Sequence, residues 1–226
     1  MRPLFITFEG LDGSGKTTHL RRVAQRLRDR GIPHRRTHEP GGTPLGDEIR
    51  RIFLSSRWGR MDGVVETLLV FASRRQHLLE VIDPALAAGE HVLCDRFTDS
   101  TRAYQGSGHG VDRAMIDRID RVATGGRVPD RTLLFDLPAE QARARGAHPE
   151  REAHPDARRL DEEDLDFYRR AREGFLGLAR AEPERIRVID SSGPKEETAR
   201  QVRAALADLL DGPPSAEAPT VEEGDR

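Results

Sequence analysis

A glycine-rich segment near the start of the chain limits its possible folds more than any other feature. Residues 10–17 read Gly-Leu-Asp-Gly-Ser-Gly-Lys-Thr and match the pattern Gly-x-x-x-x-Gly-Lys-Thr without a mismatch. The apolar run Leu4–Phe8 precedes the segment, and apolar side chains at helical spacing follow it over Thr17–Asp29. A strand, a glycine loop and a helix in this order can surround a phosphate with backbone N–H groups. The segment therefore predicts a nucleoside triphosphate site.

Lysine is rare in this chain, and one of its two lysines stands in that loop. Of 37 Lys and Arg residues, only Lys16 and Lys195 are lysine. In such a loop, Lys16 supplies a compact positive charge to the β- and γ-phosphates, and the hydroxyl of Thr17 can ligate Mg²⁺. The loop alone does not choose between a kinase, an ATPase and a GTPase.

The rest of the chain alternates strand and helix patterns, which predicts an α/β fold with a mainly parallel sheet and helices on both faces. Further strands are expected at His91–Cys94, Arg131–Leu137 and Arg185–Ile189. Helices are expected at Pro44–Leu54, Val64–Ala88, Asp112–Val122, Leu160–Ala181 and Glu196–Leu210, with another helix starting at Pro138.

The length and two unusual segments suggest the domain organisation. A chain of 226 residues suits one domain, which we place at residues 1–211, plus a tail. The tail, Gly212–Arg226, is rich in Pro, Gly, Ala and Glu, and we expect it to be disordered. Gly146–Arg159 has two His-Pro pairs and no apolar periodicity. It is either a solvated insertion or a lid, at about residues 146–159, that closes over a charged substrate.

Composition argues against several other classes of protein. The net charge of −2 gives no general attraction to nucleic acid or to an anionic membrane. Apolar runs such as Thr67–Ala72 are far shorter than the roughly 20 residues of a membrane span. The single cysteine, Cys94, excludes an internal disulfide and a metal site made of several cysteines. We expect a cytoplasmic protein.

Acidic residues at predicted strand ends help to choose among nucleotide-binding classes. The sequence lacks the Asn-Lys-x-Asp expected of a GTPase, whereas Asp95 and Asp136 each follow an apolar run. Asp95 is followed directly by Arg96. A carboxylate and a guanidinium at one sheet edge suit Mg²⁺ and a second phosphate, although a surface ion pair would give the same pattern.

Seven longer motifs occur in one order over roughly residues 3–210. They include Glu-Pro-Gly-Gly and Asp-Arg-Phe…Ala-Tyr-Gln-Gly, and they span Phe8–Thr18, Glu39–Thr43, Asp47–Arg50, Ala72–His77, Asp95–Gly106, Pro129–Thr132 and Arg159–Glu163. In these motifs the chain resembles the bacterial thymidylate kinases of the P-loop nucleoside monophosphate kinase group. The resemblance implies a three-layer P-loop kinase fold with a five-stranded sheet and a lid. It also implies phosphorylation of dTMP to dTDP by ATP with Mg²⁺, in dTTP synthesis, and a homodimer.

The resemblance also implies roles for residues around the two nucleotides. ATP would lie against Gly10, Leu11, Asp12, Gly13, Ser14, Gly15, Lys16, Thr17 and Thr18, with Thr17 and Asp95 at the metal. Lys16, Arg96, Asp12 and Arg159 would be catalytic. Arg159 is the first choice for the transition-state cation among Arg143, Arg145, Arg151, Arg158 and Arg159, since the loop carries Gly13 where some members of the family have arginine.

For the acceptor, the resemblance implies a site made of Asp12, Glu39, Arg50, Val70, Phe71, Arg74, Arg96, Ser100, Thr101, Tyr104 and Gln105. Arg96 and Arg50 would hold its phosphate by bidentate contacts. Arg74 would donate to thymine O4, and a hydroxyl of Ser100 or Thr101 would accept from N3–H. Tyr104 would crowd the 2′ position of the sugar.

The sequence leaves two questions open, the residue that contacts the base and the class of protein. Either Val70 forms a thin apolar wall beside the base, or Phe71 forms it together with Arg75 in a shifted frame, because neighbouring helical residues point about 100° apart. The enzyme could instead phosphorylate another small acceptor such as a deoxynucleoside, or the chain could be a nucleotide-binding switch. The pair Arg50 and Arg96 favours an acceptor that already carries a phosphate.

Overall fold

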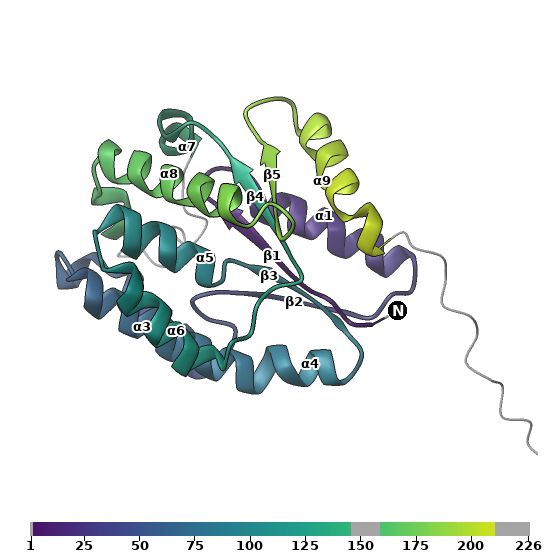
Figure 1. The fold of residues 1–226 in the computed structure, drawn as a ribbon, viewed down its shortest axis with the longest axis horizontal. Helices are drawn as coiled ribbons and strands as arrows, with labels where there is room; N and C mark the ends of the chain where they lie inside the picture. Colours follow the sequence, from purple (N-terminus) through teal and green to yellow (C-terminus); the bar gives the residue numbers. More distant parts are fainter. Residues whose placement is uncertain (1, 146–158, 211–226) are drawn as a thin grey trace, which may run out of the picture.

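Strand β1 (Phe5–Gly10) lies in the middle of the sheet and leads directly into the glycine-rich loop. The structure, a computed structural model, describes residues 2–145 and 159–210. In this part of the chain the sheet has five parallel strands in the order β2-β3-β1-β4-β5 (Figure 1). The other strands are β2 (His34–His38), β3 (His91–Asp95), β4 (Arg131–Asp136) and β5 (Ile186–Asp190). The predicted α/β fold with a five-stranded parallel sheet is confirmed.

Alternate side chains of β1 enter two apolar cores, one on each face of the sheet. Ile6 and Phe8 pack with apolar side chains of α1 (Lys16–Asp29) and α9 (Lys195–Leu210). Phe5 packs with Val92 and Leu78 in a separate cluster. This two-residue period, with both faces covered, is what a parallel sheet requires.

The remaining helices cover the face of the sheet opposite α1 and α9 or lie at its rim (Figure 1). They are α2 (Pro44–Leu54), α3 (Gly63–His77), α4 (Asp83–Ala87), α5 (Thr98–Thr101), α6 (Arg113–Thr124), α7 (Ala139–Arg145) and α8 (Leu165–Ala181). None of the helices described here is long and apolar enough to cross a bilayer.

Two segments of π-helix interrupt the helical layer. Leu78–Ile82 joins α3 to α4, so the predicted helix Val64–Ala88 is continuous although its hydrogen bonding changes. Arg102–Gly108 continues α5 in the same way. π-Helical turns are uncommon and are often found at functional sites, and this second segment carries Tyr104 and Gln105.

The structure differs from the sequence-based expectations at two places. The sequence did not indicate strand β2, because this edge strand reads His-Arg-Arg-Thr-His and has no apolar alternation. The helix expected from Leu160 is wrong at its start: a 3₁₀ turn covers Arg159–Glu162, and α8 begins at Leu165. The cause is Asp164, whose extended backbone stops the turn and whose side chain accepts a 2.6 Å hydrogen bond from the Phe167 N–H. The predicted lid, apart from Arg159, and the predicted tail lie outside the described residues.

Candidate active site

The glycine-rich loop joins β1 to α1 through left-handed backbone. Gly10, Gly13 and Gly15 have φ values of +133°, +81° and +85°. A Cβ atom on Gly10 would lie 2.4 Å from the carbonyl oxygen of Phe135 on the neighbouring strand. Only glycine satisfies both conditions at this position. The loop therefore has the tight backbone that a phosphate cradle requires, directly before the N-terminus of α1.

Lys16 lies at the base of this loop with its side chain buried. Its Nζ is 3.5 Å from the carbonyl oxygen of Leu11 and 3.4 Å from Oδ1 of Asp12. Burial, with a further contribution from the nearby charge of Arg96, lowers the pKa of Lys16. A buried ammonium group near the phosphate loop is well placed to gain from an incoming phosphate.

Asp95 and Thr17 meet at the carboxyl edge of the sheet. The Thr17 hydroxyl donates to Oδ2 of Asp95 over 2.5 Å. The other acidic strand end, Asp136, is held by two hydrogen bonds from Arg172, of 2.7 and 2.8 Å. Of the two candidates, Asp95 is thus the one that contacts the loop threonine. A hydroxyl and a carboxylate are oxygen donors of the kind that Mg²⁺ prefers, so this pair fits the implied metal.

Arg96 connects the loop to the neighbouring pocket. It follows β3 and is the only non-glycine residue with positive φ, +74°, in the described part of the chain. Its Nη1 donates to the Gly10 carbonyl oxygen and to Ser100 Oγ, both at 3.0 Å, and its Nη2 donates to Asp12 Oδ1 at 2.7 Å. A left-handed backbone costs a side-chain-bearing residue energy, so its persistence at this position indicates a structural demand at the site.

Glu9 hydrogen-bonds to the residues that follow Arg96, although the sequence analysis did not single out Glu9. Its carboxyl group is fully buried and accepts from the Phe97 N–H at 2.7 Å and from the Ser100 hydroxyl at 2.5 Å. Burial, reinforced by the negative charge of Asp99, raises the pKa of Glu9 to about 8. This carboxyl group therefore keeps its proton to a higher pH than an exposed glutamate does.

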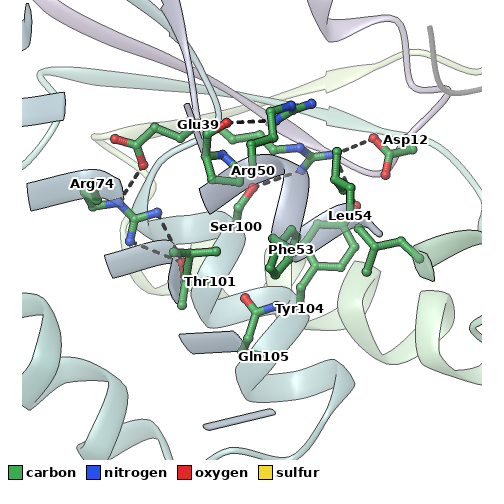
Figure 2. Close-up of a pocket in the computed structure, with 14 residues that line it drawn as sticks. Asp12, Glu39, Arg50, Phe53, Leu54, Arg74, Ser100, Thr101, Tyr104 and Gln105 are labelled. Carbon is green, nitrogen blue, oxygen red and sulfur yellow. Dashed lines mark hydrogen bonds and ion pairs between the residues drawn. The ribbon is translucent and has the colours of Figure 1, made fainter. Parts of the chain in front are cut away.

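A pocket of about 550 Å³, part of it open to solvent, lies next to Arg96 (Figure 2). Ten of the eleven side chains that the sequence assigned to the acceptor line it. The complete lining is Asp12, Glu39, Pro40, Arg50, Phe53, Leu54, Val70, Arg74, Arg96, Ser100, Thr101, Tyr104, Gln105 and Leu160. Its lining combines apolar side chains with a few polar groups, as small-molecule sites usually do, and Arg50 and Arg96 give it positive charge.

The eleventh residue, Phe71, lies behind the pocket wall. It packs against Ile116 and Ala123, whereas Val70 belongs to an apolar cluster with Phe53 that faces the pocket. The shifted frame is not adopted, since Arg75 Nη1 donates to the Ala123 carbonyl oxygen at 3.4 Å. The sequence analysis did not name Phe53 as a pocket residue. It could have been suspected as an aromatic side chain near the end of the amphipathic helix Pro44–Leu54.

Arg74 is fixed in place by its neighbours (Figure 2). Its Nε donates to Glu39 Oε2 at 2.6 Å, and Nη1 and Nη2 both donate to Thr101 Oγ1 at 3.2 Å. His77 Nδ1 lies 2.9 Å from the other oxygen of Glu39. Burial alone would raise the pKa of Glu39, but Arg74 and His77 together hold it below its usual value. Glu39 therefore orients Arg74 as an ionised partner.

Arg159, expected as the transition-state cation, is placed differently by the structure. It is buried, its Nε donates to the Phe53 carbonyl oxygen at 2.7 Å, and its Nη1 donates to the carboxylate of Glu66. Its guanidinium carbon lies 4.8 Å from the centre of the Phe53 ring. Because these contacts commit the group to the back of the pocket wall, Arg159 supports that wall in this structure. Of the other arginines named for the role, Arg151 and Arg158 lie outside the described residues.

Comparison with known proteins gives one consistent result. The model of the family described as thymidylate kinase matches residues 8–202. A protein of Geobacter sulfurreducens named thymidylate kinase is 48% identical over 208 residues, covering 91% of this chain and 95% of its own length. One of Pelotomaculum thermopropionicum with the same name is 44% identical, covering 93% and 96%. The crystal structure of thymidylate kinase from Ehrlichia chaffeensis matches with a TM-score of 0.71 at 33% identity, covering 91% of this chain and 99% of that one.

The raised pKa of Glu9 predicts a pH-dependent stability difference for Glu9→Gln. Between pH 4.5, the usual pKa, and about 8, the folded chain keeps a proton that the unfolded chain has released. The contribution of Glu9 to the free energy of unfolding therefore falls as pH rises through this range. We expect the variant to gain stability relative to the parent with rising pH, by at most about 1.4 kcal/mol per pH unit.

Urea unfolding at several pH values within that range measures the difference. Glu48→Gln, at an exposed site on α2, is the control and should show no such trend. A Glu9→Gln difference that stays constant with pH would mean that Glu9 ionises normally.

Proposed function

This chain belongs to the thymidylate kinase family, and we propose that it catalyses the family's reaction with the loop and the pocket described above. It is a nucleoside monophosphate kinase that phosphorylates dTMP to dTDP. We infer that the donor is the γ-phosphoryl group of ATP. The observation that best supports this site is the position of Arg96, which contacts the phosphate loop on one side and lines the acceptor pocket on the other.

Phosphoryl transfer is mostly positioning and charge stabilisation, so it needs cations around both bound phosphates. Lys16 and the loop backbone would hold the donor. Arg96 and Arg50 would hold the acceptor phosphate, with Arg50 kept in place by its 2.9 Å hydrogen bond to the Pro40 carbonyl oxygen. Asp12, which pairs with both Lys16 and Arg96, would lie where the two phosphates meet.

Thr17 and Asp95 would hold Mg²⁺ beside the donor. When bound there, the ion neutralises charge on the β- and γ-phosphates. The short hydrogen bond between the two side chains keeps both oxygens on the same side of the loop.

For the base, Arg74 would donate to thymine O4 with the N–H groups that Glu39 and Thr101 leave unused. Val70 and Phe53 would pack against the ring. Tyr104, whose ring centre lies 5.1 Å from the guanidinium carbon of Arg96, would crowd the 2′ position of the sugar. The acceptor for N3–H would be Gln105, because the Thr101 hydroxyl oxygen already receives two hydrogen bonds from Arg74.

A panel of acceptors tests the proposal. The purified chain, with ATP and Mg²⁺, is offered dTMP, thymidine and the other deoxynucleoside monophosphates, and ADP release is measured. We expect dTMP to react fastest and EDTA to stop the reaction. Faster turnover of thymidine would point to a nucleoside kinase, and ADP release that does not depend on any acceptor would point to a nucleotide switch.

Replacement of the loop lysine should stop catalysis without unfolding the chain. We expect Lys16→Ala to lower kcat by at least about 100-fold, since a preorganised charge at the transferring phosphate is lost. Circular dichroism should show an unchanged fold. Lys195→Ala, at the exposed start of α9, removes the only other lysine and should keep full activity. Equal activity of Lys16→Ala and the parent at saturating ATP would contradict the assigned role.

We also propose that the chain forms a homodimer through α3 and the π-helical segment after it. Val65, Leu68 and Leu79 expose 46%, 52% and 50% of their surfaces there, and exposed apolar side chains along one helix favour association. Sedimentation velocity at micromolar concentration should give a dimer, and Leu68→Glu should shift it to the monomer. A parent chain that sediments as a monomer would refute this assembly.

A further inference from the structure

Glu66 lies behind the acceptor pocket, in the first turn of α3, with no exposed surface. Three side chains from distant parts of the chain converge on its carboxylate. Arg159 donates to Oε1, Gln105 Nε2 donates to Oε2 over 2.8 Å, and His109 Nε2 lies 3.4 Å from the same oxygen. Glu66 itself does not line the pocket, and the resemblance to the kinase family did not single it out.

The surroundings of Glu66 keep it ionised. Burial alone would raise its pKa, but the nearby His109 ring and the positive charge of Arg159 together hold the pKa of Glu66 below its usual value. An ionised carboxylate can only accept hydrogen bonds. Whatever faces Glu66 must therefore be a donor.

This requirement determines how the amide group of Gln105 is oriented. Its NH₂ end must face Glu66, so its carbonyl oxygen is at the other side of the amide. Figure 2 shows the amide end of Gln105 pointing towards the space beside Thr101 and Phe53. Gln105 therefore presents a hydrogen-bond acceptor to the pocket.

The neighbouring hydroxyl groups are already engaged. Thr101 Oγ1 accepts from both terminal nitrogens of Arg74. Ser100 Oγ accepts from Arg96 and donates to Glu9. Among these three polar side chains, Gln105 has the oxygen that is best placed to accept from a bound base.

We propose that Glu66 determines which pyrimidine the pocket accepts, by holding the Gln105 carbonyl oxygen towards the base. Thymine has a donor at N3, which this oxygen can accept. Cytosine has an acceptor at N3, which would face the same oxygen and leave both groups unpaired, and a site built for one hydrogen-bonding partner rejects the other strongly. Glu66 is thus a positioning residue that acts through Gln105, and the inference rests on the proposed function.

The variant Glu66→Gln should weaken this preference, while Arg74, which can only donate, still favours the O4 of thymine. Arg159 can only donate, so the introduced amide must turn its oxygen towards the guanidinium group. Its NH₂ group then faces Gln105, which must turn its own carbonyl oxygen inwards. The pocket then meets the base with a donor instead of an acceptor.

Two substrates reveal this change: dTMP and 5-methyl-dCMP, which differ only at N3 and at the 4-substituent. The ratio of their kcat/KM values should fall at least about tenfold in Glu66→Gln. The matched control is Glu80→Gln, because exposed Glu80 also accepts from a glutamine amide, that of Gln76, away from the pocket. Its ratio should equal that of the parent.

A double-mutant cycle separates this role from a purely structural one. Gln105→Met should lower the ratio to a similar extent, and adding Glu66→Gln to it should lower the ratio no further. A Glu66→Gln variant that loses activity on both substrates by the same factor would overturn the proposal. So would a double variant in which the two losses multiply.

If Glu66→Gln does not fold, a double substitution tests the same role. Glu66→Met combined with Arg159→Met removes both buried charges, which is often tolerated, and leaves Gln105 without its acceptor. A folded protein of this kind with an unchanged ratio would refute the role of Glu66. Failure of the parent chain to phosphorylate dTMP at all would instead refute the proposed function.

Discussion

The arrangement of this site depends on one guanidinium group, that of Arg96, being held at the junction between the phosphate loop and the pocket. It hydrogen-bonds to the end of β1, to the loop carboxylate Asp12 and to Ser100. Its left-handed backbone is held in place by Glu9, which accepts a hydrogen bond from the N–H group of the next residue, Phe97. Since β1 and β3 are adjacent parallel strands, their carboxyl ends bring the loop and Arg96 together. The sheet order thus places the two nucleotide sites side by side.

Much of the site could be predicted from the sequence, because its residues lie in contiguous motifs that follow strand ends. The order of the motifs placed Asp12, Arg74, Arg96 and Gln105 in one pocket, and the structure brings them together. The central strands and most helices were predicted for a similar reason, since their apolar periodicity is local. The strand β2 escaped prediction because its place in the sheet comes from pairing with β3 and from no pattern of its own.

What the sequence could not supply were contacts made across the fold. Glu9 and Glu66 look like ordinary strand and helix residues until burial and their partners are known. For Arg159, motif position alone suggested a catalytic role, whereas the structure shows the side chain buried and paired with Glu66. Its ion pair with Glu66 is formed across 93 residues of sequence, and no local pattern predicts such a pair. The choice between Val70 and Phe71 likewise needed the packing of α6 behind α3.

The π-helical segment Arg102–Gly108 has a consequence for how base preference could change over evolution. A π-turn contains one residue more than an α-turn, so this segment is equivalent to an α-helix that has absorbed a single-residue insertion. Loss of one residue would restore ordinary helical winding and rotate everything after it by about 100°. Gln105 would then leave its alignment with Glu66, whereas α5, which precedes the segment, would keep its place. The winding of this segment thus determines whether the Gln105 amide can meet both Glu66 and a bound base.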